Sequence, residues 1–210
     1  MQGRRNLNYF SSDAFLSLDV GRGILRSRGG TRMLGISEDF LRGFVTACED
    51  EAGSAAPFIL RRCGQFFGAR LARRFESELA DFAGQSIRDR TMSEFDALLR
   101  DLWLGCGLGE IDVDWAQGAR GFIPIRLSGS PMQDIGPSGH VGDDMFTGIL
   151  EGFFSNFGDG EMRCVQTGDR RLGDRDGTTF ILAPFDTAKR VEGMVAEKTP
   201  HARIIESLAA

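Results

Sequence analysis

The chain has 210 residues, 41% of them hydrophobic and 26% charged, which is the composition of an ordinary globular domain and excludes a disordered chain. The net charge of −5 is spread without a basic stripe, which excludes a surface that captures nucleic acid through its phosphates. No apolar run reaches the roughly 18 residues of a membrane-spanning helix, which excludes insertion into a membrane.

The N-terminal segment, residues 1–32, is rich in Arg, Gly and Ser and has no sustained hydrophobic period. We therefore expect a flexible basic arm. Met33 opens a more regular pattern, and translation from Met33 is an alternative to translation from Met1. No apolar block follows the arginines as it would in a secretory signal, so we expect a cytoplasmic protein.

Three helices are predicted in the next part of the chain, over residues 37–48, 57–82 and 91–102. On the second helix, Phe66 and Phe67 are expected on the buried stripe, with the arginines in water. The third helix begins with a capping box of sequence TMSE, in which a hydroxyl and a carboxylate satisfy backbone amides.

Two strands are predicted after these helices, over residues 110–115 and 121–127, because apolar and polar residues alternate there. Pro124 cannot donate to a strand ladder, so we expect the second strand at a sheet edge or beside a bulge. Residues 128–142 form a polar loop rich in Gly and Pro. A strongly apolar helix should follow over residues 143–157.

The last elements predicted are two strands, over residues 162–167 and 178–183, joined as a hairpin by a charged connector. Helices that are segregated from short antiparallel strands indicate an α+β fold, with helices packed on a small sheet in one domain over residues 33–186. Residues 187–210 are charged and weakly periodic, so we expect a tail or a docking segment. Seventeen Phe against one Tyr favour core and subunit contacts over hydrogen-bonded recognition.

Candidate catalytic and metal-binding residues are few. His140 could act as a general base, but it has no nucleophile near it in sequence, and a solvated loop histidine explains it. Asp143 and Asp144 could join His140 at a metal ion, but capping of the following helix explains both acids. Asp112 and Asp114 share one strand face, as an acid/base pair could, but alternation toward solvent is the simpler explanation. We therefore predict no catalytic residue, no cofactor, no metal and no enzyme activity.

Glycines and cysteines offer no clearer site. The glycines at residues 105–110 resemble a phosphate loop, but they follow a helix and precede a strand, which is the reverse of the order such loops need. They are interpreted as a helix stop and a turn. The cysteines are widely spaced, without a C-x-x-C pair, and we interpret them as buried free thiols. They are Cys48, Cys63, Cys106 and Cys164.

Three segments carry a resemblance to a known family. They read FLRGFVTACEDEAG followed by LRRCGQFFGARLARRF, then TMSEFDALLRDLWLGCGLGEIDV, then FTGILEGFFSNF. The last segment places Leu150, Glu151, Gly152 and Phe153 on a family-signature helix. In this order, over residues 37–183, they resemble the D subunit of bacterial cellulose synthase complexes, although GLG stands where that family has a tryptophan-glycine turn.

This resemblance implies a non-catalytic accessory subunit that assembles from dimers into a ring-like octamer. Its implied role is to guide nascent glucan chains and promote crystalline cellulose, with the other synthase subunits and the glucan as partners. The residues that contact glucan stay unassigned. Trp103 and Trp115 could stack on sugar rings, and core packing is the alternative. The periplasm, where members of the family have also been placed, is the alternative location.

A second resemblance is the alternative. LWLGCGLG, MFTGILEGFF and MRCVQTGD are similar to the small-molecule-binding domain named after 4-vinyl reductase, although the last strand, GTTFILA, lacks that family's second cysteine. This resemblance implies a binding or sensor domain with an apolar ligand between helices and sheet. Of the two resemblances, the cellulose family is preferred.

Overall fold

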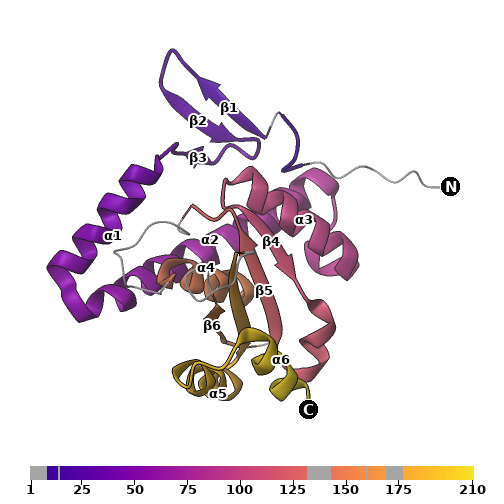
Figure 1. The fold of residues 1–210 in the computed structure, drawn as a ribbon. Helices are drawn as coiled ribbons and strands as arrows, with labels where there is room; N and C mark the ends of the chain where they lie inside the picture. Colours follow the sequence, from indigo (N-terminus) through magenta and orange to yellow (C-terminus); the bar gives the residue numbers. More distant parts are fainter. Residues whose placement is uncertain (1–8, 14, 132–142, 159, 169–176) are drawn as a thin grey trace.

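A computed structural model describes residues 9–13, 15–131, 143–158, 160–168 and 177–210. In this part of the chain, helices pack on both faces of a four-stranded antiparallel sheet, and a second, three-stranded sheet lies at one end (Figure 1). The α+β fold class and the single domain predicted from the sequence are confirmed. None of the described helices combines the length and the apolar character that crossing a membrane requires.

The elements follow the predicted order from residue 37 onward, and two helices close the chain. The helices are α1 (Glu38–Ala52), α2 (Ala56–Ala83), α3 (Met92–Gly105), α4 (Asp144–Phe154), α5 (Phe185–Ala196) and α6 (His201–Ala209). Short 3-10 turns are η1 (Gly53–Ala55), η2 (Ile87–Asp89) and η3 (Trp115–Arg120). The strands are β1 (Leu16–Asp19), β2 (Ile24–Ser27), β3 (Arg32–Met33), β4 (Glu110–Val113), β5 (Ile123–Ser128), β6 (Met162–Gly168) and β7 (Thr178–Pro184). The predicted capping box of α3 is present.

The larger sheet has the strand order β4-β5-β7-β6, with every pair antiparallel. Successive residues of β7 divide between two hydrophobic clusters. Phe180 and Leu182 belong to the cluster with α2, α3 and α4, whereas Ile181 and Ala183 belong to the cluster with α5 and α6. The sheet is therefore covered on both faces, which explains why β7 is apolar without alternation.

Pro124 lies in an inner strand, so the predicted edge position is wrong. It pairs with Ile181 of β7, while β5 also pairs with β4. The Pro124 carbonyl accepts from the amide of Asp114 at 3.0 Å, just beyond the end of β4. In an extended strand the N and C=O of one residue point to the same side. The missing N–H therefore falls on the side where β4 ends, and the ladder with β7 loses no bond.

The N-terminal segment is folded where it is described, which corrects the flexible arm predicted over residues 1–32. Strands β1, β2 and β3 form an antiparallel sheet beside α2 and α3 (Figure 1). Tyr9, Phe10 and Phe15 are buried in the main core, and the Phe10 ring stacks on Phe75 with centroids 5.5 Å apart. The flexible arm was predicted because residues 1–32 show no sustained hydrophobic period. A few buried aromatic rings are nevertheless enough to hold this segment on the core.

A buried carboxylate on α2 holds this sheet in place. Glu78 accepts hydrogen bonds from the hydroxyls of Tyr9 at 3.0 Å and of Ser27 and Thr31 at 3.2 Å each. A Cβ on Gly29 would lie 2.5 Å from the Glu78 side chain, so the chain passes close by because a glycine is there. Burial, helped by the hydrogen bond to Glu78, raises the pKa of Tyr9, so its hydroxyl stays protonated as a donor.

The C-terminal segment docks on the domain itself. Residues 187–210, predicted as a charged tail or a docking segment, form most of α5 and all of α6. Val191 of α5 and Ile204 of α6 are fully buried with Phe122 and Ile181 under the sheet. Pro200 separates the two helices and stands at the N-cap of α6. It therefore limits helix length without preventing a helix.

Candidate functional site

Helices α2 and α4 cross with their backbones in close contact, which four glycines make possible. Gly64 and Gly68 lie on α2, and Gly148 and Gly152 on α4. A Cβ on Gly148 would lie 2.0 Å from the carbonyl oxygen of Arg61, and the other three would lie 2.1 or 2.2 Å from backbone oxygens of the facing helix. The two backbones approach this closely only because no side chain intervenes.

The same crossing explains an error of the sequence prediction. Phe66 and Phe67, expected on the buried stripe of α2, are 59% and 42% exposed. Helix α4 lies instead on the side of α2 that carries Gly64 and Gly68, which the hydrophobic pattern leaves blank. The exposed phenylalanines agree with the predicted homo-oligomer, which stays a prediction.

Replacing Gly148 by Ala is expected to lower the unfolding free energy by about 2–3 kcal/mol, because the new Cβ meets backbone that cannot rotate away. Gly43→Ala in α1 is the matched control. Nothing lies within 4 Å of a Cβ there, so the change should be neutral or stabilise the helix by about 0.5–1 kcal/mol. Urea unfolding measures both. An unchanged midpoint for Gly148→Ala would contradict the close crossing.

The crossing brings a buried ion pair together at its centre. The Glu151 side chain is 3% exposed and pairs with Arg61, whose Nε donates to Oε2 at 3.1 Å and whose Nη2 donates to Oε1. Gln65 donates to Oε2 at 2.7 Å, and the amide of Cys164 donates to Oε1 at 3.0 Å. Arg61 also donates to the Cys164 carbonyl at 3.0 Å. One carboxylate therefore joins α2, α4 and β6.

The ionisation of Glu151 follows from these contacts. Burial opposes the charged form, but hydrogen bonds from Arg61, the Cys164 amide and Gln65 outweigh it, so the pKa of Glu151 is lowered. The pKa of Arg61 is raised, because its pairing with Glu151 outweighs the effect of burial. Both groups are charged at neutral pH, and every oxygen of the carboxylate has a donor, as expected of a structural junction.

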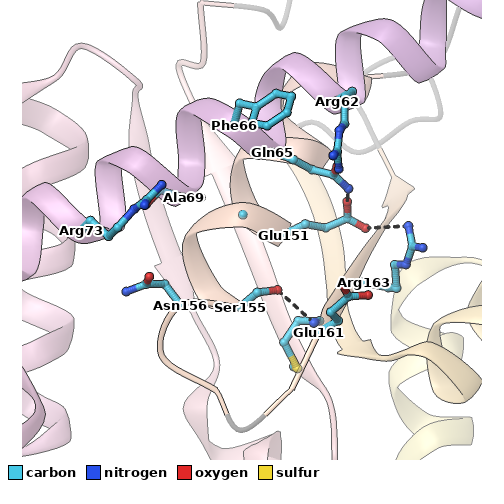
Figure 2. A pocket seen from close by; sticks show the side chains of 12 residues that line it. Arg62, Gln65, Phe66, Ala69, Arg73, Glu151, Ser155, Asn156, Glu161 and Arg163 are labelled. Atoms are coloured by element: carbon cyan, nitrogen blue, oxygen red, sulfur yellow. Dashed lines mark hydrogen bonds and ion pairs between the residues drawn. The ribbon is translucent and has the colours of Figure 1, made fainter.

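An open polar groove runs along this junction and encloses about 610 Å³ (Figure 2). Figure 2 shows the Glu151 carboxylate between Gln65 of α2 and Arg163 of β6, with Arg62 and Phe66 above it. Because the carboxylate is already satisfied and the rest of the lining is exposed or half-buried, the groove offers a ligand little burial.

A second, mostly apolar pocket of about 430 Å³ lies between η2, the start of α3, the end of α4 and the sheet. Its lining comes from segments far apart in the sequence. The lining residues are Ile87, Arg88, Arg90, Met92, Phe95, Trp115, Ile123, Phe154, Phe157, Gly158, Met162 and Leu182. Pockets that hold small molecules are typically apolar, of about 300–1,000 Å³, with a few polar groups, and this pocket has that character.

Aromatic rings form one wall of the apolar pocket. Phe95 makes edge-to-face contacts with Trp115, with centroids 5.7 Å apart, and with Phe157 at 5.3 Å. Trp115 in turn contacts Phe154 at 6.0 Å. The indole N–H of Trp115 donates to Asp96 at 2.8 Å, so its polar atom is satisfied by a protein partner. This wall favours a flat apolar or aromatic ligand.

Two arginines supply the polar part of the apolar pocket. Arg88 donates to Glu76 at 2.9 Å and to the Asn156 carbonyl at 2.6 Å, and its guanidinium lies 5.6 Å from the centroid of the Phe157 ring. The Arg90 side chain is only 6% exposed, although it carries a charge. The pocket therefore combines an apolar wall with a buried cation.

The residues of the predicted family signature belong to the core and the junction. Leu150 and Phe153 are fully buried, Gly152 lies at the helix crossing, and Glu151 is the buried carboxylate. Trp103 is fully buried, with its ring 5.4 Å from that of Phe153, which bears out the core alternative. The sequence carries a sign of the ion pair as well, because Glu151 is the one acidic residue beyond the first turn of the strongly apolar helix α4.

The acidic candidates that the structure describes each have a protein partner of their own. Asp112 receives a hydrogen bond from Arg100 at 2.7 Å, and Asp114 receives one from the Ala116 amide at 3.1 Å. Asp143 caps α4 by accepting from the Phe146 amide at 3.1 Å. His140 lies outside the described residues. Within the described ranges, no three His, Cys, Asp or Glu side chains gather where a metal ion could bind.

The cysteines are free in the described structure, as predicted, but only Cys164 is fully buried and Cys63 is exposed. Burial raises the pKa of the Cys106 thiol to about 11 and that of Cys164 well above its ordinary value. Neither thiol is therefore a ready nucleophile at neutral pH. The predicted turn after α3 is present, with Gly107 and Gly109 at positive φ.

Known proteins resemble the chain in structure only. No protein-family model and no curated protein matches it. The phenol-responsive sensory domain of the transcription activator PoxR, determined with phenol, is similar with a TM-score of 0.68 and 15% identity, over 92% of this chain and 96% of that chain.

Two further structures are similar at 15% identity. Trafficking protein particle complex subunit 3 from Naegleria fowleri, covalently bound to palmitic acid, has a TM-score of 0.51 over 70% of this chain and 93% of that chain. A vinyl-4-reductase family protein from Methanocaldococcus jannaschii has a TM-score of 0.45 over 71% and 82%. At such identity the likeness concerns the fold alone. The chain has the fold of the PoxR sensory domain over nearly its whole length.

Proposed function

We propose that the chain is a small-molecule-binding sensor domain that holds a flat, largely apolar ligand in the apolar pocket. The pocket itself carries the proposal, since an aromatic wall, a volume of about 430 Å³ and two arginines occur together. A cavity of about 150 Å³ is enough for benzene, so this one has room for a molecule of one or two rings.

The molecules bound to two similar structures support the proposal. The PoxR domain is phenol-responsive and was determined with phenol, and the Naegleria fowleri subunit is bound to palmitic acid. Phenol is a flat apolar ring with one polar group, and palmitic acid is a long apolar chain that is held there covalently. An apolar pocket with polar groups at one side would suit the same kind of molecule in this chain.

Binding of phenol and 2-naphthol tests the proposal. Saturation-transfer NMR and thermal shift measure the binding. Ile123→Phe adds a ring inside the pocket and is expected to weaken binding at least tenfold, because it fills the space. Phe66→Ala is the matched control, since Phe66 lines only the polar groove of the two cavities. It should bind both probes like the wild type.

Two outcomes would count against the proposal. Equal binding by Ile123→Phe and the wild type would mean that the probes do not bind in the apolar pocket. Loss of binding in Phe66→Ala would mean that they bind in the polar groove. Circular dichroism confirms that each variant is folded.

The cellulose accessory function remains a separate prediction. Neither the PoxR domain nor the Naegleria fowleri subunit is a cellulose synthase subunit. The signature residues on which it depends, Leu150 to Phe153, are accounted for by core packing and by the buried ion pair. The absence of enzyme activity, the glucan partner and the cytoplasmic location also stay predictions.

A further inference from the structure

Arg90 is an unusual residue for the wall of an apolar pocket. It follows η2 and precedes Thr91, the N-cap of α3, and it lines the apolar pocket with a side chain that is only 6% exposed. A buried cation costs free energy unless it is paired and hydrogen-bonded. The partners of this guanidinium therefore decide what the pocket can hold.

The Arg90 guanidinium is under-satisfied. Its Nε is closed to water and has no hydrogen-bond partner among the described residues. Its Nη1 lies 3.9 Å from Oε1 of Glu94, which is beyond hydrogen-bond distance. The Glu94 side chain is half exposed, and its other oxygen accepts from the Thr91 amide at 3.0 Å and from the Thr91 hydroxyl at 2.9 Å. Glu94 thus serves the helix cap and is a weak partner for Arg90.

The neighbouring arginine shows that the loop itself does not prevent pairing. Arg88, two residues earlier, lines the same pocket and donates to both Glu76 and the Asn156 carbonyl. Of the two arginines in the pocket lining, Arg90 is therefore the one without an acceptor at hydrogen-bond distance, and it shares that lining with Phe95 and Trp115.

We propose that the ligand of the apolar pocket is an aromatic carboxylate whose carboxylate pairs with Arg90. This inference rests on the proposed function and adds the charge of the ligand to it. A guanidinium matches a carboxylate through two parallel N–H···O bonds. Because Arg88 is already paired with Glu76, Arg90 with Glu94 nearby suits a single negative charge, whereas a phosphate dianion would be repelled by Glu94 and by the net charge of −5.

The test compares benzoate and 1-naphthoate with their neutral analogues, benzyl alcohol and 1-naphthalenemethanol, on the full chain. The wild type is expected to bind each carboxylate at least tenfold more tightly than its neutral analogue. Arg90→Met keeps the length and removes the charge, so it should lose at least tenfold for the carboxylates and stay unchanged for the alcohols. Arg90→Lys should fall between, because it keeps the charge without the fork.

Two controls separate this role from a structural one. Without ligand, Arg90→Met should keep or raise the melting temperature, since it removes an unsatisfied buried group. Arg88 lines the same pocket, and Arg88→Met should leave the preference for carboxylates over alcohols intact.

The outcomes distinguish the two proposals. Equal benzoate affinity for wild type and Arg90→Met, or a wild-type preference for the alcohols, overturns the carboxylate inference and leaves the binding function in place. Failure of all four probes, with phenol and 2-naphthol also unbound, overturns both.

Discussion

A chain that begins at Met33 is expected to lose more than about 5 kcal/mol of unfolding free energy and to aggregate on warming. The deletion removes Phe10 and Phe15 from the core beside Phe75, and loss of one buried Phe side chain typically costs about 3–5 kcal/mol. It also removes all three hydroxyls that donate to Glu78, so it leaves a carboxylate facing newly exposed apolar surface.

Urea unfolding of the full chain and the shortened chain measures the effect. Phe10→Ala and Leu18→Ala form a matched pair within the N-terminal segment. Phe10 is buried, so Phe10→Ala should lower the unfolding free energy by about 3–5 kcal/mol. Leu18 is 62% exposed, so Leu18→Ala should leave the unfolding free energy almost unchanged. Equal midpoints for the full and the shortened chain would mean that the N-terminal sheet adds no stability.

The segment that the sequence prediction missed shows where periodicity stops being informative. Strands β1 to β3 have two to four residues each, and Leu16 and Leu18 of β1 are exposed. Their position depends on Glu78, which lies 47 or more residues away along the chain from its donors. Helix α3 was predictable because it has a long amphipathic run, and β4, although only four residues long, was predictable because its residues alternate between exposed and buried.

The apolar pocket could not be predicted from the sequence for a related reason. Periodicity places Phe95 and Phe154 on buried faces, but it does not show that the two helix ends leave space between them. Arg90 reads like any surface arginine until its burial is known. The helix crossing did leave a signal, because glycines stand four residues apart on both partners, at 64 and 68 and at 148 and 152.

Replacing Glu151 by Ala is expected to lower the unfolding free energy by about 3–5 kcal/mol, because the change leaves a partly buried cation without its partner. Arg61 would lose both bonds to the carboxylate, while Gln65 and the Cys164 amide would lose their acceptor. Since α2, α4 and β6 meet at this side chain, we expect one cooperative transition at lower urea concentration. A shift smaller than about 1 kcal/mol would contradict the role of Glu151 as the junction.

Acid should act on the same pair in a defined direction. The folded pKa of Glu151 lies below its ordinary value near 4.5, so its contribution is complete above that value and is lost as the pH falls through the folded pKa. The double variant Arg61→Met with Glu151→Leu provides the control, because it removes both charges. It should be less destabilised than Glu151→Ala and should lack this acid-dependent loss, since no buried charge is then left unpaired. Unfolding of the three proteins at pH 7 and pH 4 separates the ion pair from the packing of the helix crossing.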